Sequence, residues 1–307
     1  MIGPEYPTLA SFYEAQVAAF PEHRGYLERR FRDDDAADLE FCEALTKTIA
    51  PIVGDNLQGY VEDYRWLAEI VIEEEIAFRR TGRYRLSTFE EANREVYANR
   101  EYMTRYMNGL LMSQLWWRNH TQVMRYFRDT YLPTVPAGGK HLEIGPGHGL
   151  FLYYAAEYSK AGSVSGWDIS ETSLDLVRHT FRSVGLGRPV DLDLVDMFSG
   201  PENTFDSVTF SEVLEHMEEA APALEAIFRV LKPGGRAFIN APVNSPAPDH
   251  LILFKTPEEV VDHVRAAGFE IEGTLFSPTS GASLERARKM GLAISTAVIG
   301  IKPELKA

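Results

Sequence analysis

Four side chains in the C-terminal half combine carboxylate and imidazole chemistry at short spacing. Glu212, Glu215 and His216 lie three and four residues apart, so a helical turn beginning there would place all three on one face. His250 follows in a proline-rich stretch further along the chain. Carboxylates and imidazoles together can bind a divalent cation, and the oxygen ligands favour Mg2+ or Mn2+. A neutral imidazole at His216 or His250 can instead take a proton from an acceptor, and the sequence leaves these two roles open.

A glycine-rich loop precedes this cluster along the chain. In the run HLEIGPGHGL, Glu143 is followed by Gly145, Gly147 and Gly149 at alternate positions. Glycine lets the backbone turn tightly and approach a ligand where a Cβ would collide. The spacing differs from the G-x-G-x-x-G of dinucleotide enzymes, which disfavours an NAD-dependent dehydrogenase.

Two further acidic residues follow the next β-rich runs. Asp168 and Ile169 lie in the run GWDIS, about 20 residues beyond the loop, where a carboxylate can accept both hydroxyls of a ribose. Asp196 and Met197 end the run after that, where a polar side chain can meet an adenine amino group. These positions predict a nucleoside-type ligand.

The elements that must position these residues follow a Pro/Gly junction at residues 131–140 (YLPTVPAGGK). Before the junction the pattern is helical, with an apolar stripe on residues 57–71 and a capping box expected at Ser87 and Glu90. After it, β-rich runs alternate with helical ones, which predicts a mostly parallel sheet with helices on both faces. The expected strands are 141–144, 164–168, 190–195, 207–210, 236–241, 271–276 and 294–301, and the expected helices between them are 150–158, 173–184, 221–231 and 258–267. We therefore expect an all-α region over 1–135 and an α/β domain over 136–307.

Taken in this order, the glycine loop, Asp168, Asp196 and the runs 205–216 and 231–238 resemble the class I S-adenosylmethionine (SAM)-dependent methyltransferases over residues 140–304. The resemblance implies a seven-stranded, Rossmann-like sheet that ends in an antiparallel hairpin, and it implies SAM as the cofactor.

The resemblance also assigns roles within the expected cofactor site. It implies that Glu143 and the three loop glycines hold the methionine part of SAM and that Asp168 holds the ribose. Asp196 and Met197 would flank adenine, and Ser211 and Glu212 would lie near the open side of the cofactor.

The Glu-x-x-Glu-His pattern with a later histidine is similar to the metal sites of small-RNA terminal 2′-O-methyltransferases and ubiquinone-pathway O-methyltransferases. The same Glu-His pair is widespread in methyltransferases that use no metal, so three readings stay open: Mg2+ or Mn2+ at Glu212, Glu215, His216 and His250, a general base at His216 or His250, or a purely structural role. Because methyl transfer is an in-line displacement at a sulfonium, positioning alone can also do much of the work.

Aromatic side chains are dense in residues 102–128, among them Tyr102, Tyr106 and Trp117. Packing between helices explains such spacing, but the same side chains can form a lid over an acceptor pocket. In small-molecule methyltransferases extra N-terminal helices commonly cover the active site or form a dimer interface, so we expect a cap or a homodimer contact here.

Composition limits the partners. The 307 residues carry a formal net charge of −14 and one cysteine, Cys42. This charge disfavours nucleic acid as a partner, and the lone cysteine suits a reducing cytoplasm. Neither a signal peptide nor an apolar run long enough for a membrane span is apparent, so we expect a cytoplasmic protein that does not bind membranes.

The expected function is methyl transfer from SAM to a small molecule, with bacterial specialised metabolism as a setting. Three rivals stay open. One is another use of SAM, either cyclisation or transfer of the aminocarboxypropyl arm. The second is a regulatory SAM-binding module, and the third is a nucleic-acid methyltransferase.

Overall fold

The computed structural model describes residues 2–32 and 34–304. Among these residues, no helix combines the length and the apolar character needed to cross a membrane.

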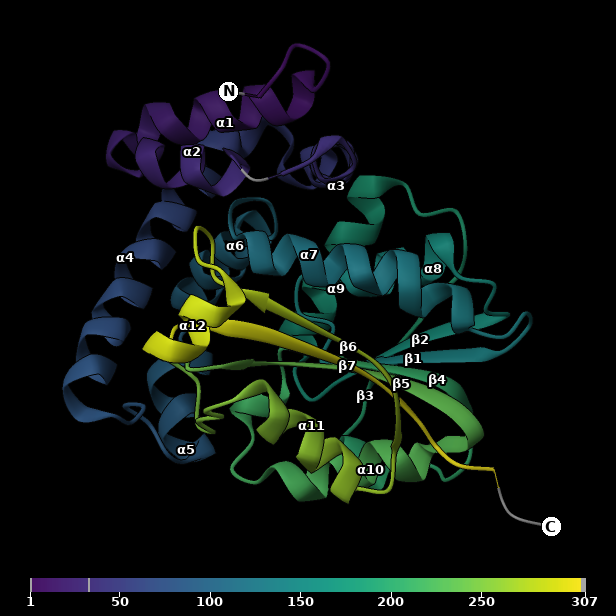
Figure 1. Cartoon of the computed structure of the whole chain (residues 1–307). Coiled ribbons are helices and arrows are strands. Elements are labelled where there is room, and N and C mark those ends of the chain that lie inside the picture. The colour runs from purple at the N-terminus through teal and green to yellow at the C-terminus, as the bar shows by residue number, and fades with distance from the viewer. Residues whose placement is uncertain (1, 33, 305–307) are drawn as a thin grey trace.

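Helices form the first part of the chain, as the sequence predicts (Figure 1). Their bounds are α1 Pro7–Ala19, α2 Arg24–Arg32, α3 Ala36–Val53, α4 Leu57–Thr81, α5 Phe89–Ala92, α6 Arg100–Trp116 and α7 Arg118–Tyr126. Short 3-10 turns, among them η1 Pro21–His23, η2 Gly54–Asn56 and η5 Leu132–Thr134, and two π-helical turns, η3 Asn93–Tyr97 and η4 Phe127–Tyr131, connect or extend them. The expected stripe on α4 is confirmed, since Tyr60, Tyr64 and Leu67 are buried.

The expected capping box is wrong by one residue. Thr88, not Ser87, accepts a hydrogen bond from the backbone N–H of Glu91, and the Glu91 carboxylate accepts one from the backbone N–H of Thr88. Two overlapping pairs in the sequence have the same spacing, and α5 begins after the second of them.

The second part of the chain forms one seven-stranded sheet in the order β3-β2-β1-β4-β5-β7-β6. Its strands are β1 Lys140–Ile144, β2 Ser163–Asp168, β3 Asp191–Leu194, β4 Phe205–Ser211, β5 Leu231–Val243, β6 Glu270–Pro278 and β7 Ile294–Ile301. The first five pair in parallel, whereas β7 runs antiparallel to both β5 and β6. The expected sheet and its terminal hairpin are confirmed.

Helices cover both faces of this sheet. They are α8 Leu150–Tyr158, α9 Glu171–Val184, α10 Ala220–Val230 and α11 Pro257–Ala266, with α12 Leu284–Met290 between the last two strands. In Figure 1, α10 and α11 lie on one face, and α7 and α8 lie on the other. The helix α12 was not expected from the sequence.

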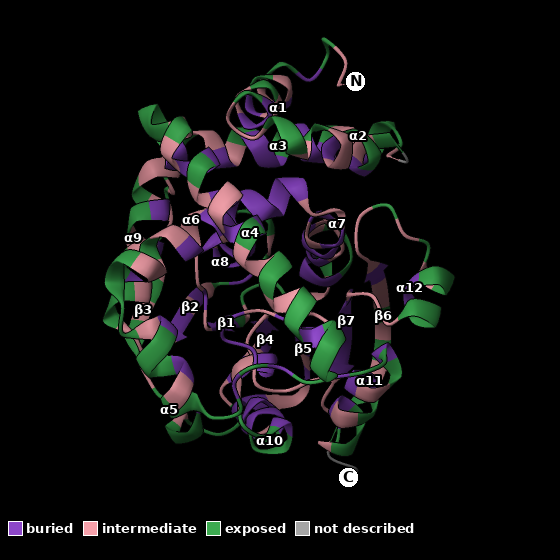
Figure 2. Cartoon of the chain, turned by 90° about the vertical axis from the view of Figure 1, so that its left-hand side faces the viewer, coloured by how far each residue is buried: buried purple, intermediate pink, exposed green. Residues whose placement is uncertain are grey.

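The N-terminal helices share a core with the sheet. Phe127 packs on Phe151 and Phe238 with ring centroids 4.9 and 5.1 Å apart, and the hydroxyl of Tyr131 donates to the carbonyl of Val208 at 2.8 Å. Figure 2 shows buried residues along α3, α8 and the strands. One continuous core therefore runs beneath the junction at which the sequence places a domain boundary, and the boundary itself stays a prediction.

Candidate functional site

The parallel strands β1 to β5 end along one edge of the sheet, and the candidate residues follow those ends. The glycine loop leaves β1 with Gly145 at φ +68° and Gly147 at φ +52°, values that disfavour other residues. A Cβ on Gly145 would lie 2.8 Å from the Cγ2 atom of Val213 in the loop after β4. Glycine is therefore required where the loops after β1 and β4 meet.

Glu143 lies one residue before the end of β1, and 3% of its surface is exposed. Its Oε2 atom has no hydrogen-bond partner among the described residues. Burial raises the pKa of this carboxyl well above its usual range. A buried, unpaired acid is costly, so the position suits a ligand that brings a donor group or a positive charge.

Asp168, the last residue of β2, and Asp196, just beyond β3, differ in their surroundings. Asp168 accepts a hydrogen bond from the Ser170 backbone N–H at 2.8 Å, and burial raises its pKa to about 6. Asp196 accepts from the backbone N–H of Phe198 at 3.0 Å and begins a 3-10 turn.

The apolar residues that follow these two acids, Ile169 and Met197, also differ in exposure. Ile169 is 64% exposed and free to contact a ligand, whereas the side chain of Met197 is buried in the core beneath the sheet. An adenine contact at Met197 would therefore use its backbone. No pattern in the sequence marks Phe198, whose ring is 47% exposed beside Asp196.

Three of the four candidate cation ligands converge. Glu215, His216 and His250 each have one possible metal-ligating atom, a donor atom in the coordination sense, and these three atoms lie within 4.8 Å of one another. The Nε2 atoms of His216 and His250 lie 3.8 and 3.9 Å from Oε1 of Glu215. Both carboxylate oxygens of Glu215 are buried without a hydrogen-bond partner among the described residues. We call these three residues the donor centre.

Glu212 lies outside the donor centre. Its φ of +54° interrupts the expected helical turn, and a short 3-10 turn, η7 Leu214–His216, forms only after it. The Glu212 carboxylate instead accepts a hydrogen bond from Nδ2 of Asn240 on β5 at 2.6 Å. Burial raises the pKa values of both Glu212 and Glu215.

Backbone carbonyls set the tautomers of the two histidines. Nδ1 of His250 lies 2.7 Å from the carbonyl of Ser245, and Nδ1 of His216 lies 3.1 Å from that of Asp249. Because a carbonyl oxygen only accepts, both Nδ1 atoms carry the proton on this assignment. In the neutral form of either ring, the Nε2 atom would keep its lone pair beside Glu215, and burial lowers the pKa of His250 to about 4.

Two neighbouring residues that sequence reasoning missed complete this site. The buried Asp249 carboxylate accepts hydrogen bonds from the hydroxyls of Tyr106 at 2.8 Å and Tyr97 at 3.2 Å. The adjacent His250 could have drawn attention to Asp249, but nothing in the sequence marks Tyr97.

The three aromatic candidates of the N-terminal region have different positions. The Tyr106 hydroxyl reaches Asp249 in the site, and the Tyr102 ring stacks on the Tyr106 ring with centroids 6.0 Å apart. Trp117 lies further out, where its indole donates to the hydroxyl of Tyr64 at 3.0 Å and its ring meets His120 edge-on. His120 lines a small cavity between α6–α7 and the strand ends, together with Gln114, Val123, Phe151, Ser211, Glu212, Asn240 and Ser295.

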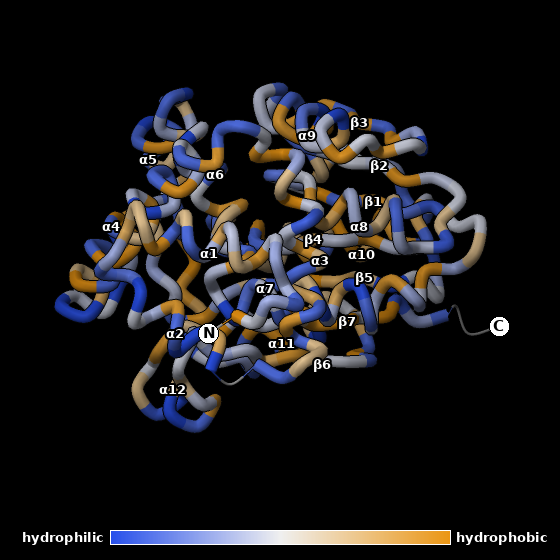
Figure 3. The backbone as a smooth tube through the Cα atoms, turned by 90° about the horizontal axis from the view of Figure 1, so that it is seen from above, coloured by the Kyte–Doolittle hydropathy of each residue, from blue (hydrophilic) through white to orange (hydrophobic). Residues whose placement is uncertain are grey.

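The helix α6 also covers the glycine loop. A Cβ on Gly147 would lie 3.3 Å from Cε of Met107. Figure 3, which views the molecule from above, shows α4, α5 and α6 grouped at one end. Contacts of Tyr106 and Met107 place this end over the carboxyl ends of the strands.

Comparisons with known proteins agree with this geometry. Residues 142–239 match the family model described as a methyltransferase domain. The ubiquinone biosynthesis O-methyltransferase of Thiobacillus denitrificans is 32% identical over 177 residues, which cover 49% of this chain and 73% of that protein.

Two solved structures show the same fold. The apo form of the S-adenosylmethionine-dependent methyltransferase SibL has a TM-score of 0.54 at 17% identity, covering 81% of this chain and 74% of that one. The cyclase SpnF has a TM-score of 0.50 at 21% identity, covering 61% of this chain and 82% of that one.

Proposed function

Because the chain belongs to the class I SAM-dependent methyltransferases, we propose that it transfers the methyl group of SAM to a hydroxyl group of a small molecule. The observation that carries the proposal is the convergence of Glu215, His216 and His250 beside the strand ends that bind SAM in this family. A hydroxyl acceptor must lose a proton on methylation. The carboxylate and imidazole lone pairs of this site suit that demand, because they can take the proton or bind a cation.

The residues around the glycine loop fit SAM. The unpaired carboxyl oxygen of Glu143 matches the positively charged methionine part of the cofactor, and the positive φ values of the loop let the backbone approach it. Asp168 would accept the ribose hydroxyls, with Ile169 beside the adenosine.

The donor centre fits a divalent cation, in the proposal Mg2+ or Mn2+. Two imidazole Nε2 atoms that face Glu215, and a Glu215 carboxylate with no hydrogen-bond partner among the described residues, would supply three of the ligands of the ion. A bound ion would act as a Lewis acid and lower the pKa of the acceptor hydroxyl. Glu212 was one of the expected cation ligands, but it lies outside the donor centre and lines the small cavity. We therefore assign it a role in contact with the acceptor substrate.

In the reaction, the acceptor oxygen forms a bond to the methyl carbon while the carbon–sulfur bond breaks. The electron pair of that bond returns to sulfur, which leaves as S-adenosylhomocysteine. Glu212, which lines the small cavity beside Ser211 and Asn240, would take the proton of the acceptor. The α6 helix, through Tyr102 and Tyr106, would close the acceptor side and exclude water, and Trp117 would support the far wall through His120.

The test is a product assay with SAM and a panel of hydroxylated small aromatic acceptors, read by mass spectrometry. We expect S-adenosylhomocysteine and a methylated acceptor in equal amounts. Methylthioadenosine would instead support cyclisation or transfer of the aminocarboxypropyl arm, and binding of SAM without any product would support a regulatory module.

A chelator separates the two roles of the histidines. We expect EDTA to abolish turnover and Mg2+ or Mn2+ to restore it. Turnover that is indifferent to EDTA would contradict the cation and leave His216 and His250 as candidate bases. A homodimer, a cytoplasmic location and a role in specialised metabolism stay predictions of the sequence.

A further inference from the structure

The two loops that carry the donor centre are held by one segment of the N-terminal region. We call residues 84–106 the strap. Three of its contacts reach these loops: the Tyr84 hydroxyl accepts from the Ser245 N–H at 3.0 Å, Arg85 Nη2 donates to the Pro248 carbonyl at 3.3 Å, and the Phe89 N–H donates to Glu218 at 2.8 Å. The loops also bind each other, since the carbonyl of Glu215 accepts from the N–H groups of Leu251 and Ile252.

Tyr97 occupies the central position of the strap. It ends the π-helical turn η3, and its hydroxyl oxygen lies 3.2 Å from Oδ2 of Asp249 and 3.2 Å from Nδ1 of His216. A carboxylate only accepts, so the Tyr97 hydroxyl donates to Asp249 and its oxygen can accept from the His216 ring. One hydroxyl thus bridges the loop after β4 and the loop after β5.

Tyr106 binds the other oxygen of the Asp249 carboxylate. Its hydroxyl donates to Oδ1 of Asp249 at 2.8 Å. Tyrosines from the N-terminal region therefore hydrogen-bond to both oxygens of Asp249. The Asp249 carboxylate thus does not compete with Glu215 for the cation. The side chain of Asp249 is 3% exposed, which leaves it little freedom to turn away.

We infer that Tyr97 is a positioning residue through which docking of the strap assembles the donor centre. It acts on the His216 ring, whose Nε2 atom it aims at the point shared with Glu215 and His250. The inference rests on the cation centre of the proposed function. Outer partners of this kind orient ligating imidazoles, and their loss lowers metal affinity by about 10-fold to 100-fold.

The experiment is a Mn2+ titration of the full chain, read by the electron paramagnetic resonance signal of free Mn2+ and by calorimetry. Tyr97→Phe removes only the hydroxyl, and Tyr158→Phe, on the exposed side of α8, is the matched control. We expect Tyr97→Phe to bind Mn2+ at least about 10-fold more weakly than the wild type, with unchanged affinity for SAM. Tyr106→Phe should weaken Mn2+ binding in the same direction.

The outcomes separate this inference from the function on which it rests. Mn2+ affinity equal in Tyr97→Phe and the wild type would overturn the positioning role and leave the proposed cation centre intact. A wild type that binds no Mn2+ would overturn the cation centre, and the positioning role with it. A parallel loss of SAM affinity in Tyr97→Phe would indicate a general loss of structure and would also contradict the inference.

Discussion

At the end of β2, burial raises the pKa of Asp168 to about 6, against the opposing effect of the Ser170 and Ile169 N–H groups. Above that pH the carboxylate is ionised and can accept the ribose hydroxyls, whereas below it the group is protonated. We therefore expect the affinity for SAM to fall as the pH drops through about 6, by up to about 10-fold per pH unit. Calorimetric titrations between about pH 5 and about pH 8 would measure this dependence.

The variant Asp168→Asn is the control for that titration. It should bind SAM weakly at every pH, because the amide cannot ionise, and its affinity should not change near pH 6. A wild-type pH dependence that survives in Asp168→Asn would assign the titration to another group.

Glu215 provides a second test at the scale of one residue. Its two carboxylate oxygens are buried and unpaired, so Glu215→Gln keeps the shape and removes only the ability to hold a charge. We expect the variant to lose stimulation of turnover by Mg2+ or Mn2+ while it still binds SAM, as judged by turnover and calorimetry. The exposed neighbour Glu219 is the matched control, and Glu219→Gln should behave as the wild type; equal stimulation in both variants would rule out Glu215 as a ligand.

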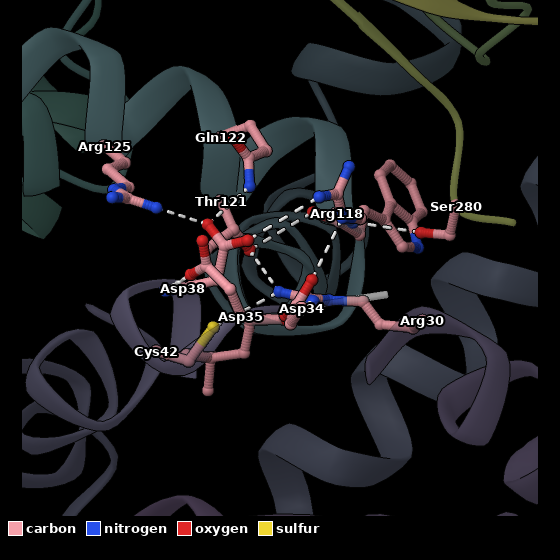
Figure 4. A network of polar contacts seen from close by, with 12 residues as sticks. Arg30, Asp34, Asp35, Asp38, Cys42, Arg118, Thr121, Gln122, Arg125 and Ser280 are labelled. Carbon is pink, nitrogen blue, oxygen red and sulfur yellow. Dashed lines mark hydrogen bonds and ion pairs between the residues drawn. The ribbon is translucent and has the colours of Figure 1, made fainter. Parts of the chain in front are cut away.

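At the scale of elements, a buried polar network joins α2 and α3 to the bend between α6 and α7 (Figure 4). Arg30, of which 1% is exposed, pairs with Asp34 and donates to Thr121 Oγ1 at 3.0 Å and to the carbonyl of Leu115 at 3.2 Å. That carbonyl belongs to the last turn of α6, where helical acceptors lack intrahelical partners. Arg30 therefore holds the bend that carries Trp117.

Replacing this arginine should be costly. Arg30→Met leaves Asp34 with Arg118 alone, and loss of one partner of a buried pair costs about 3 to 5 kcal/mol. Urea unfolding would measure the change in the free energy of unfolding. Arg265→Met, which breaks an exposed pair with Asp262, should cost about 1 kcal/mol or less; similar losses in the two variants would contradict the role of the network.

The sequence predicted elements better than it predicted their partners. Most strands carry apolar or β-branched runs between turn signals, and every expected range overlaps its strand, although β3 (DLDL) has no β-branched residue and β5 begins at Leu231, before the expected start. The helix α12 was missed because its seven residues, LERARKM, are mostly charged and too few to show an apolar stripe. In the site, the glycine loop and Asp168 are local patterns, whereas Tyr97 and Asp249 lie 152 positions apart, so only the folded chain brings them together.

At the scale of the whole molecule, the continuous core predicts cooperative unfolding. Trp116, in α6, is fully buried in the same cluster that holds Phe151 and Phe238, while Trp167 reports on β2. In the wild type, the urea transitions followed by tryptophan fluorescence and by circular dichroism should have the same midpoint, because neither part can lose its packing alone. Two separate midpoints would instead support an independent N-terminal domain.

The central claim is that the carboxyl edge of this sheet binds SAM, and calorimetry with SAM, S-adenosylhomocysteine and NAD tests it most directly. The glycine loop, the unpaired acid of Glu143 and the carboxylate of Asp168 predict micromolar binding of SAM and S-adenosylhomocysteine, no response to NAD and a severe loss of affinity in Asp168→Ala. Failure to bind SAM, or equal binding of NAD, would contradict the account.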